Sequence, residues 1–130
     1  MSAERRVGVV GRGWATVDIE RAAVELADLI GGGGFDDAAR STWLGARCAR
    51  ARALDRTDGE WIVLLEPDTE GRLAGFLARH GEGWAATWET AGHAELVGPR
   101  PGPLGPETLQ PGHPIGGPFR LSTTAATIER

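Results

Sequence analysis

The sequence lacks lysine and tyrosine altogether, and Cys48 is its only cysteine. All fourteen basic residues are therefore arginines, which excludes a Schiff-base lysine and a lysine nucleophile. A single cysteine permits neither an intrachain disulfide nor a cysteine-based zinc cluster. Long apolar runs are missing as well: residues 1–13 contain too short a run for a signal peptide, and no stretch approaches the length of a membrane span. We therefore expect a soluble, cytoplasmic protein.

The composition is that of one globular domain with a small acidic excess. A chain of 130 residues can bury roughly two-thirds of its unfolded surface without help from a metal or a disulfide. The formal net charge of −4 argues against nucleic acid or an anionic membrane as the main partner. We expect a single domain over residues 1–130 that binds neither.

The stretch 61–90 carries the clearest local pattern, which predicts strand, short helix and strand. Residues 61–65 are a short apolar run rich in β-formers, and Pro67 ends it because proline has no N–H for a continuing ladder. Asp68 or Thr69 then follows at the position where a side-chain oxygen can cap a helix.

The helix of this stretch is expected to carry Glu70 in its first turn, where the helix dipole favours a negative charge. Arg79 and His80 would close its last turn, and Gly81 is a natural stop in the left-handed conformation. After it, residues 84–90 alternate bulky and small side chains. This alternation predicts a strand with the following residues on one side: Trp84, Ala86 and Trp88.

The N-terminal region predicts a strand followed by a helix. Residues 6–10 fit a strand, and residues 14–17 fit either a second strand or its continuation after the glycine break. Asp18 is a plausible N-cap for a helix over residues 19–30. That helix has a regular apolar face and is stopped by four glycines at 31–34.

Residues 35–54 admit two interpretations. Alanine and arginine are strong helix formers, and Leu44, Cys48 and Ala51 fall on one helical face. The alternative is a hairpin with strands at 35–42 and 46–54 and a turn near Gly45. Propensity alone favours the helix.

The C-terminal region changes in composition. Seven of the eight prolines lie in or at the edge of residues 91–118, and no helical period survives there. We expect either an ordered but irregular excursion or a long flexible loop. Residues 119–124 then predict a final strand.

Three segments resemble the vicinal oxygen chelate superfamily, which includes the glyoxalase, bleomycin-resistance and methylmalonyl-CoA epimerase families. Residues 64–67 (LLEP) and 73–83 (LAGFLARHGEG) are similar to the central segment of the epimerases, and residues 15–22 (ATVDIERA) look like the first strand and helix start of the superfamily. The resemblance implies an α+β fold of βαβββ modules, whose curved mixed sheet forms a cleft. It also implies that residues 35–54 are a hairpin, and we adopt that interpretation.

The resemblance divides the chain into a first module with its linking helix and strand at 7–90 and a reduced second module at 91–130. The family places a helix and three more strands in the second module, but residues 91–130 show no helical pattern. A half-sheet with an exposed edge leaves backbone N–H and C=O groups unpaired, and a second copy of the chain can pair with them. We therefore expect a homodimer.

The resemblance fails at the metal ligands. Two histidines follow the GEG motif in the epimerases, and Ala85 and Ala86 stand there in this chain. No histidine lies in residues 7–17, Val63 lies near a polar ligand position, and residues 119–124 offer no glutamate. Divalent ions need several converging oxygen or nitrogen ligands. We therefore expect no metal and no cofactor, and do not transfer the metal-dependent epimerase or glyoxalase activity.

Five tryptophans are the most suggestive feature, and they have two interpretations. They line a cleft for a flat or hydrophobic ligand, or they pack the core under the helices. We count Thr16 and Cys48 with them as candidate ligand-binding residues, although Cys48 also fits a small buried hydrophobe. The tryptophans are Trp14, Trp43, Trp61, Trp84 and Trp88.

Glu66 and Glu82 are the candidate catalytic residues. Glu66 ends a predicted strand and Glu82 lies in a glycine turn, and together they would form a general acid–base pair if both faced one pocket. The alternative is that both carboxylates are solvated or cap the backbone.

These observations favour a metal-free protein that binds a small, partly hydrophobic organic ligand, with a role in sequestration or as a biosynthetic accessory. A rival is an enzyme: a metal-independent isomerase, cyclase or lyase, or an epimerase-like enzyme acting on an acyl substrate. A third possibility is a structural or partner-binding subunit whose cleft is filled.

Overall fold

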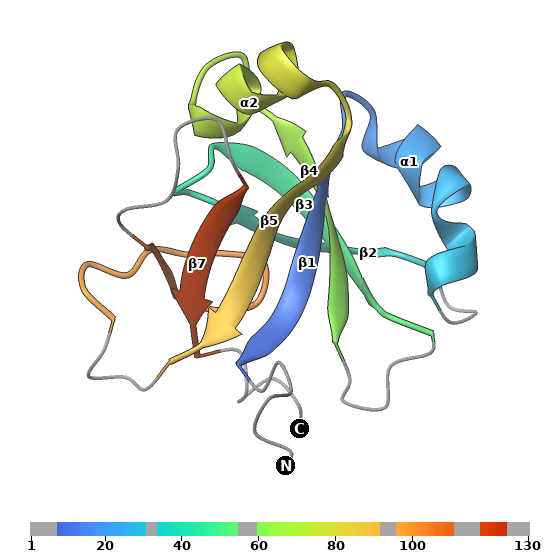
Figure 1. Cartoon of the computed structure of the whole chain (residues 1–130). Helices are drawn as coiled ribbons and strands as arrows, with labels where there is room; N and C mark the ends of the chain where they lie inside the picture. The colour runs from blue at the N-terminus through green and yellow to red at the C-terminus, as the bar shows by residue number, and fades with distance from the viewer. Residues whose placement is uncertain (1–7, 31–33, 55–59, 92–95, 111–117, 125–130) are drawn as a thin grey trace.

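The computed structural model describes residues 8–30, 34–54, 60–91, 96–110 and 118–124. Within these ranges no helix is both long and apolar enough to cross a membrane. The elements, shown in Figure 1, are β1 (Val9–Ala15), α1 (Ile19–Glu25), the short 3₁₀ helix η1 (Ala27–Leu29), β2 (Asp36–Ser41), β3 (Ala46–Arg52), β4 (Trp61–Pro67), α2 (Arg72–His80), β5 (Gly83–Thr90), β6 (Glu107–Leu109) and β7 (Phe119–Thr123).

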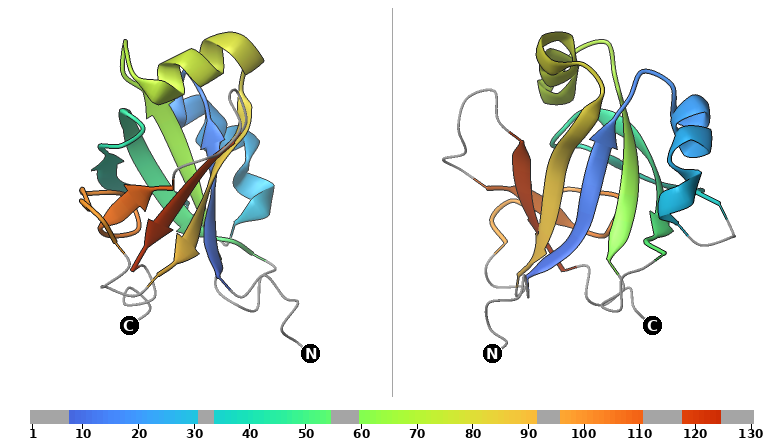
Figure 2. Two further views of the ribbon diagram at one scale, coloured as in Figure 1. Left: turned by 60° about the vertical axis from the view of Figure 1, so that its left-hand side comes forward. Right: turned by 45° about the vertical axis from the view of Figure 1, so that its right-hand side comes forward.

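The strands form one mixed sheet in the order β2-β3-β4-β1-β5-β7-β6. Strand β1 runs parallel to β4 and antiparallel to β5, and β5 runs parallel to β7. The sheet curls so that its two ends approach each other, and the backbone N–H of Thr42 donates to the carbonyl of Pro101 over 3.2 Å (Figures 1 and 2). The predicted α+β class with a curved mixed sheet is confirmed. After β5, the described residues contain two strands and no helix.

The curled sheet has a concave inner face and a convex outer face. Helix α1 lies against the outer face, where Ile19 and Ala22 pack with residues of β3 and β4 (Figure 2). Helix α2 closes one end of the inner face through Leu73 and Phe76. The inner core holds these buried residues: Ala15, Leu44, Ala46, Cys48, Val63, Leu65, Leu73, Phe76, Ala85, Ala86, Trp88, Leu104, Phe119 and Leu121.

The β1–α1 region follows the predicted pattern with two corrections. Asp18 caps α1, because its side chain accepts a hydrogen bond from the N–H of Arg21 over 3.2 Å. The α-helix ends at Glu25 and continues as the 3₁₀ turn η1, so the helix predicted over 19–30 is shorter than expected. Strand β1 also runs unbroken through its glycines. A Cβ on Gly13 would lie 2.7 Å from Leu65 Cδ1, so glycine there makes room on the inner face and does not break the strand.

Residues 35–54 form the hairpin of β2 and β3, which confirms the interpretation that the resemblance implied. Gly45, with φ of +73°, makes the turn, and its N–H donates to the carbonyl of Ser41 over 2.9 Å. Strand β3 is buried on both faces, with Cys48 in the inner core and Ala49 and Ala51 under the outer elements. Tertiary burial of small side chains thus overrides the helix propensity of the Ala-Arg sequence.

The start of α2 differs from the prediction. Gly71 is the N-cap, no side chain caps the helix, and no acidic residue lies in its first turn. Asp68 instead donates its backbone N–H to the carbonyl of Gly45 over 2.9 Å and pairs with Arg40. Packing of this segment on the hairpin turn therefore sets the helix start. The end is as predicted: Arg79 and His80 lie in the last turn before Gly81.

Strand β5 contains a bulge that corrects the predicted alternation. Gly13 of β1 pairs with Ala86, whereas the next residue, Trp14, pairs with Trp84. Ala85 therefore has no partner in β1, and the side-chain alternation shifts by one residue there. Trp84 consequently lies with Trp14 on the outer face, whereas Trp88 lies in the inner core.

Candidate functional site

The inner face is covered by the chain itself. A segment from Pro99 to Leu109, here called the 99–109 segment, crosses it and places Leu104 and Glu107 in fully buried positions. Arg50 of β3 donates from its guanidinium to the carbonyl of Pro103 over 2.8 Å. Side chains of this segment thus stand where the sequence predicts a cleft, and a Trp-lined cleft stays a prediction.

Glu107 is the polar centre of this interior. Its Oε1 accepts a hydrogen bond from Trp88 Nε1 over 2.8 Å, and its Oε2 accepts one from Ser41 Oγ over 2.7 Å. Trp43 Nε1 donates to its main-chain carbonyl over 3.0 Å. The backbone beside it is tightly packed, since a Cβ on Gly102 would overlap the Glu107 carboxyl group. Strand β2 at one end of the curled sheet and strand β5 within it thus hold the carboxyl group of Glu107, which lies in β6 at the other end.

Burial dominates the electrostatics of this site. Desolvation raises the pKa of Glu107 to about 7, although the hydrogen bonds from Ser41 and Trp88 work in the opposite direction. Glu107 therefore changes its charge near neutral pH. Burial also raises the pKa of Cys48 to about 12, so its thiol is neutral at neutral pH. This state fits the interpretation of Cys48 as a small buried hydrophobe.

The tryptophans divide between the two faces. Trp43, Trp61 and Trp88 border or enter the inner core. Arginines lie over two of these rings. Arg50 and Arg52 lie over Trp61, with guanidinium-to-centroid distances of 4.5 and 4.3 Å, and Arg100 lies over Trp43. The rings of Trp14 and Trp84 meet edge-to-face at 5.1 Å on the outer face. The five predicted ligand-binding tryptophans therefore do not line one surface.

Thr16, Glu66 and Glu82 meet at the turn between β1 and α1. Glu82 accepts hydrogen bonds from the N–H of Val17 over 3.0 Å and from Thr16 Oγ1 over 3.1 Å. The bond from Val17 is the main cause that lowers the pKa of Glu82. Glu66 accepts from the N–H of Ile19 over 3.0 Å. The carboxylates thus bind backbone N–H groups just before α1 and at its first residue, which fits the capping interpretation, and a catalytic role stays a prediction.

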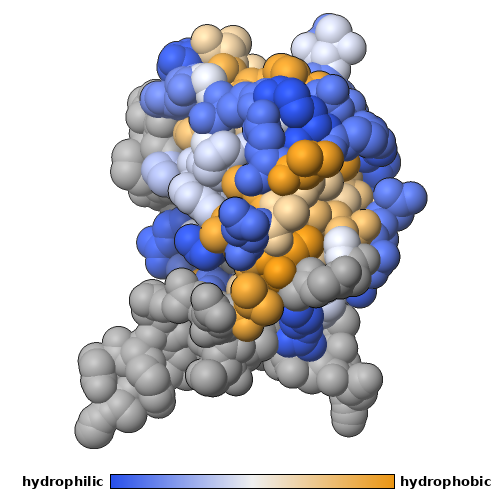
Figure 3. All heavy atoms as spheres, turned by 90° about the vertical axis from the view of Figure 1, so that its right-hand side faces the viewer, coloured by the Kyte–Doolittle hydropathy of each residue, from blue (hydrophilic) through white to orange (hydrophobic). Residues whose placement is uncertain are grey.

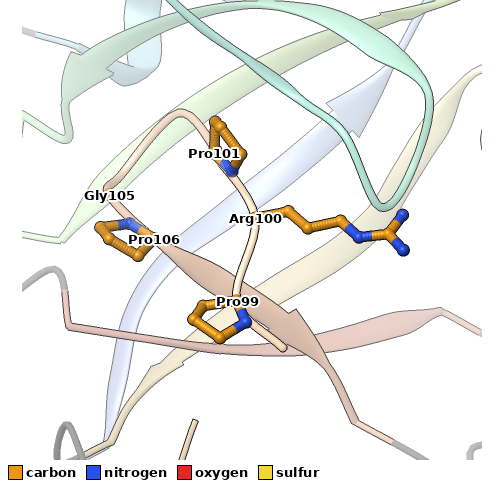
Figure 4. A pocket seen from close by; sticks show the side chains of 6 residues that line it. Pro99, Arg100, Pro101, Gly105 and Pro106 are labelled. Atoms are coloured by element: carbon orange, nitrogen blue, oxygen red, sulfur yellow. The ribbon is translucent and has the colours of Figure 1, made fainter. Parts of the chain in front are cut away.

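A shallow hollow lies on the 99–109 segment. It has a volume of about 470 Å³ and its walls are mainly proline rings. Figure 4 shows that the Arg100 side chain extends away from these rings, and its guanidinium lies 4.3 Å from the ring centroid of Trp43. The lining residues are Pro99, Arg100, Pro101, Gly102, Gly105 and Pro106.

Comparison with solved structures identifies the fold. A methylmalonyl-CoA epimerase from Mycobacterium tuberculosis matches with a TM-score of 0.69 and 19% identity, over 94% of this chain and 91% of that one. The Streptomyces coelicolor methylmalonyl-CoA epimerase in complex with 2-nitronate-propionyl-CoA matches with a TM-score of 0.66 and 19% identity, over 90% and 97%. A hypothetical protein from Bacillus halodurans C-125 gives 0.62 and 19%, over 88% and 91%. No protein-family model and no curated protein matches the sequence.

This chain has the vicinal oxygen chelate fold. Within that fold, the positions at which the resemblance implies metal ligands hold Val63, Ala85 and Ala86, all buried in the inner core. Their alkyl side chains offer no donor atom to a cation. Across the described ranges, no group of three or more His, Cys, Asp or Glu residues could hold a metal ion. The residues present therefore do not fit the metal of the superfamily.

Sequence reasoning missed Glu107, whose carboxyl group is fully buried on the inner face of this vicinal oxygen chelate fold. Its segment shows no periodicity that would place it on a face. The available signal is compositional: Glu107 is the only acidic residue from Leu96 to Ile128. Its partners Ser41 and Trp88 are 66 and 19 residues away in the chain, so no local pattern predicts their contact.

Proposed function

We propose that this protein binds a small, partly hydrophobic organic molecule on the inner face of its sheet, without a metal ion, in a sequestering or biosynthetic accessory role. One observation carries the proposal: the apolar, tryptophan-containing inner face is covered by a Pro- and Gly-rich segment, not by a helix. That segment holds only the three-residue strand β6, which pairs with β7. A ligand would take the place of its side chains.

Two ligand classes deserve priority on the basis of the fold. One of the similar epimerase structures holds 2-nitronate-propionyl-CoA, and another is in complex with methylmalonyl-CoA and NH4+. Acyl-CoA thioesters are therefore the first class to test on this chain. Free organic acids and neutral aromatic molecules form the second, because the inner face combines apolar residues with one polar centre.

The test is a ligand panel measured by tryptophan fluorescence and thermal shift, with and without EDTA. We expect one class to raise the melting temperature and to change the fluorescence equally under both conditions. A Trp84→Phe variant is the matched control: its outer-face substitution should leave the response unchanged, whereas Trp88→Phe should reduce it. Failure of every class, or a response that EDTA abolishes, would contradict the proposal.

The second candidate is a structural or partner-binding subunit whose interior is permanently filled. The full burial of Leu104 and Glu107 favours it. If it is correct, no small molecule in the panel will shift the melting temperature, and substitutions in the 99–109 segment will affect stability alone.

We also propose that the protein is a homodimer. The side of the molecule that carries α1 shows apolar atoms gathered among hydrophilic ones (Figure 3). On α1 and η1, Val24 and Leu29 are 77% and 38% exposed. Exposed apolar groups of this kind are typical of protein contacts. Light scattering after gel filtration should give twice the chain mass of 13.7 kDa, and a mass equal to one chain would contradict the proposal.

A further inference from the structure

Two hydrogen-bond donors on the inner face converge on the two oxygens of the Glu107 carboxyl group. Trp88 Nε1 lies 2.8 Å from Oε1, and Ser41 Oγ lies 2.7 Å from Oε2. The donors come from β5 and β2, which belong to the curled sheet, and both residues are fully buried. The carboxyl group comes from the covering segment, at the first residue of β6 on the edge of the same sheet. The two donors therefore belong to strands other than the one that carries the carboxyl group.

The orientation of the serine hydroxyl makes this pair specific. Ser41 Oγ accepts a hydrogen bond from the backbone N–H of Leu44 over 3.3 Å and directs its own hydrogen to Glu107. Both atoms of the pair thus act as donors. A carboxylate matches them with two acceptors, whereas a primary amide matches them only if Ser41 Oγ gives up its donor role and accepts from the amide N–H.

The same segment places an apolar side chain next to its carboxyl group. Leu104 is fully buried against β1, where a Cβ on Gly11 would lie 2.7 Å from Leu104 Cδ1. The glycine therefore leaves room for an apolar group on the inner face. Leu104 and Glu107 together present one apolar body and one carboxyl group to the sheet.

We infer that Glu107 and Leu104 are an internal stand-in for the ligand, and that the inner face binds small carboxylic acids with an apolar body, whose carboxyl group meets Trp88 Nε1 and Ser41 Oγ. The inference rests on the proposed binding function and names its ligand class. The 99–109 segment and such an acid compete for the same donors, so each excludes the other.

The first test removes the stand-in carboxyl group. Glu107→Ala leaves a space of about the size of acetate beside the two donors. We expect acetate to raise the melting temperature of this variant in a saturable manner, whereas equal concentrations of acetamide or chloride do not. The double variant Glu107→Ala with Ser41→Ala should lose most of this response, because one donor is gone. An equal response to acetate, acetamide and chloride, or an undiminished response of the double variant, would overturn the inference.

The second test uses the unmodified chain, so the inference stays testable if Glu107→Ala does not fold. Binding of 4-phenylbutanoate and of its amide is followed by tryptophan fluorescence. We expect the acid to bind about tenfold more tightly, which corresponds to about one well-formed hydrogen bond. Equal binding of both compounds would overturn the carboxyl subsite and leave the proposed function intact. A different outcome is that neither compound nor any other member of the panel binds, while acetate still raises the melting temperature of Glu107→Ala. That outcome would contradict the proposed function of the unmodified chain and would support the carboxylate site formed by the two donors.

Discussion

The two faces of the sheet place the same residue type in opposite settings. On the inner face, Trp88 is fully buried and donates its indole N–H to Glu107. On the outer face, Trp84 is 39% exposed, stacks edge-to-face on Trp14 and lies under the guanidinium of Arg12 at 4.4 Å. The difference arises from one unpaired residue, Ala85, in β5. A count of aromatic residues therefore says little about a binding surface until the register is known.

The carboxyl groups of the two faces also differ in their burial. On the inner face, one carboxyl group is held in an apolar interior by two neutral donors. On the outer side, Glu82 and Glu66 lie at the surface and combine backbone bonds with arginine partners. Buried polar groups are costly to leave unpaired, whereas exposed ion pairs contribute little. Changes on the inner face should therefore have the larger effects.

The largest expected effect separates the two tryptophans. Trp88→Ala should lower the free energy of unfolding by about 3–5 kcal/mol, because it opens a cavity and leaves Glu107 Oε1 without its donor. Trp84→Ala should lower it by only about 1 kcal/mol, since its ring is partly exposed. Urea unfolding followed by circular dichroism measures both. Equal losses would mean that the two faces do not differ as described.

The next effect concerns pH. Because the folded pKa of Glu107 is raised to about 7, its contribution to stability is complete below its unfolded value and is lost as the pH rises through about 7. Relative to Glu107→Gln, the wild type should therefore lose about 3 kcal/mol of unfolding free energy between about pH 4 and pH 8. Urea titrations of both proteins across this range measure it. Parallel pH profiles would show that Glu107 is not the titrating group.

A smaller effect compares two glycines. Gly102→Ala should destabilise the protein by about 1–3 kcal/mol, because the new Cβ overlaps the buried Glu107 carboxyl group. Gly75→Ala is the matched control in α2, where a Cβ would meet nothing within 4 Å. It should instead stabilise by about 0.5–1 kcal/mol, because alanine is the better helix former. Thermal melts of both variants measure these changes in stability. A higher melting temperature for Gly102→Ala would contradict the tight packing around Glu107.

The smallest effect tests the turn before α1. Glu82→Gln and Glu66→Gln should each lower the free energy of unfolding by about 1 kcal/mol, because each weakens a backbone cap. Binding to the inner face should not change. If either variant loses a measured turnover while it retains ligand binding and stability, the catalytic interpretation of that glutamate gains support over the capping one.

Local signals in the sequence were sufficient where a residue acts on its immediate neighbours. Asp18 caps α1 and Gly81 ends α2 as predicted, because each depends on backbone groups only a few positions away. The hairpin at 35–54 required more than propensity. Alanine and arginine favour a helix, and only the resemblance to a known superfamily indicated the strands that tertiary burial enforces.

The features that could not be predicted from the sequence depend on contacts between segments that are distant in the chain. The bulge at Ala85 and the start of α2 at Gly71 are set by neighbouring strands and by the hairpin turn, which no window of sequence contains. The same holds for Glu107. A Pro- and Gly-rich segment without periodicity gives no indication of which side chain turns inward, so the polar centre of the inner face could not be predicted.

Hydrogen exchange of the indole N–H groups tests the central claim most directly, namely that the 99–109 segment closes the inner face through Glu107. In nitrogen-15 NMR spectra, with peaks assigned by single substitutions, the Trp88 indole N–H should exchange at least about a hundredfold more slowly than that of Trp84. Glu107→Ala should remove most of this protection. A Trp88 indole that exchanges as fast as that of Trp84 in the unmodified protein would contradict the account.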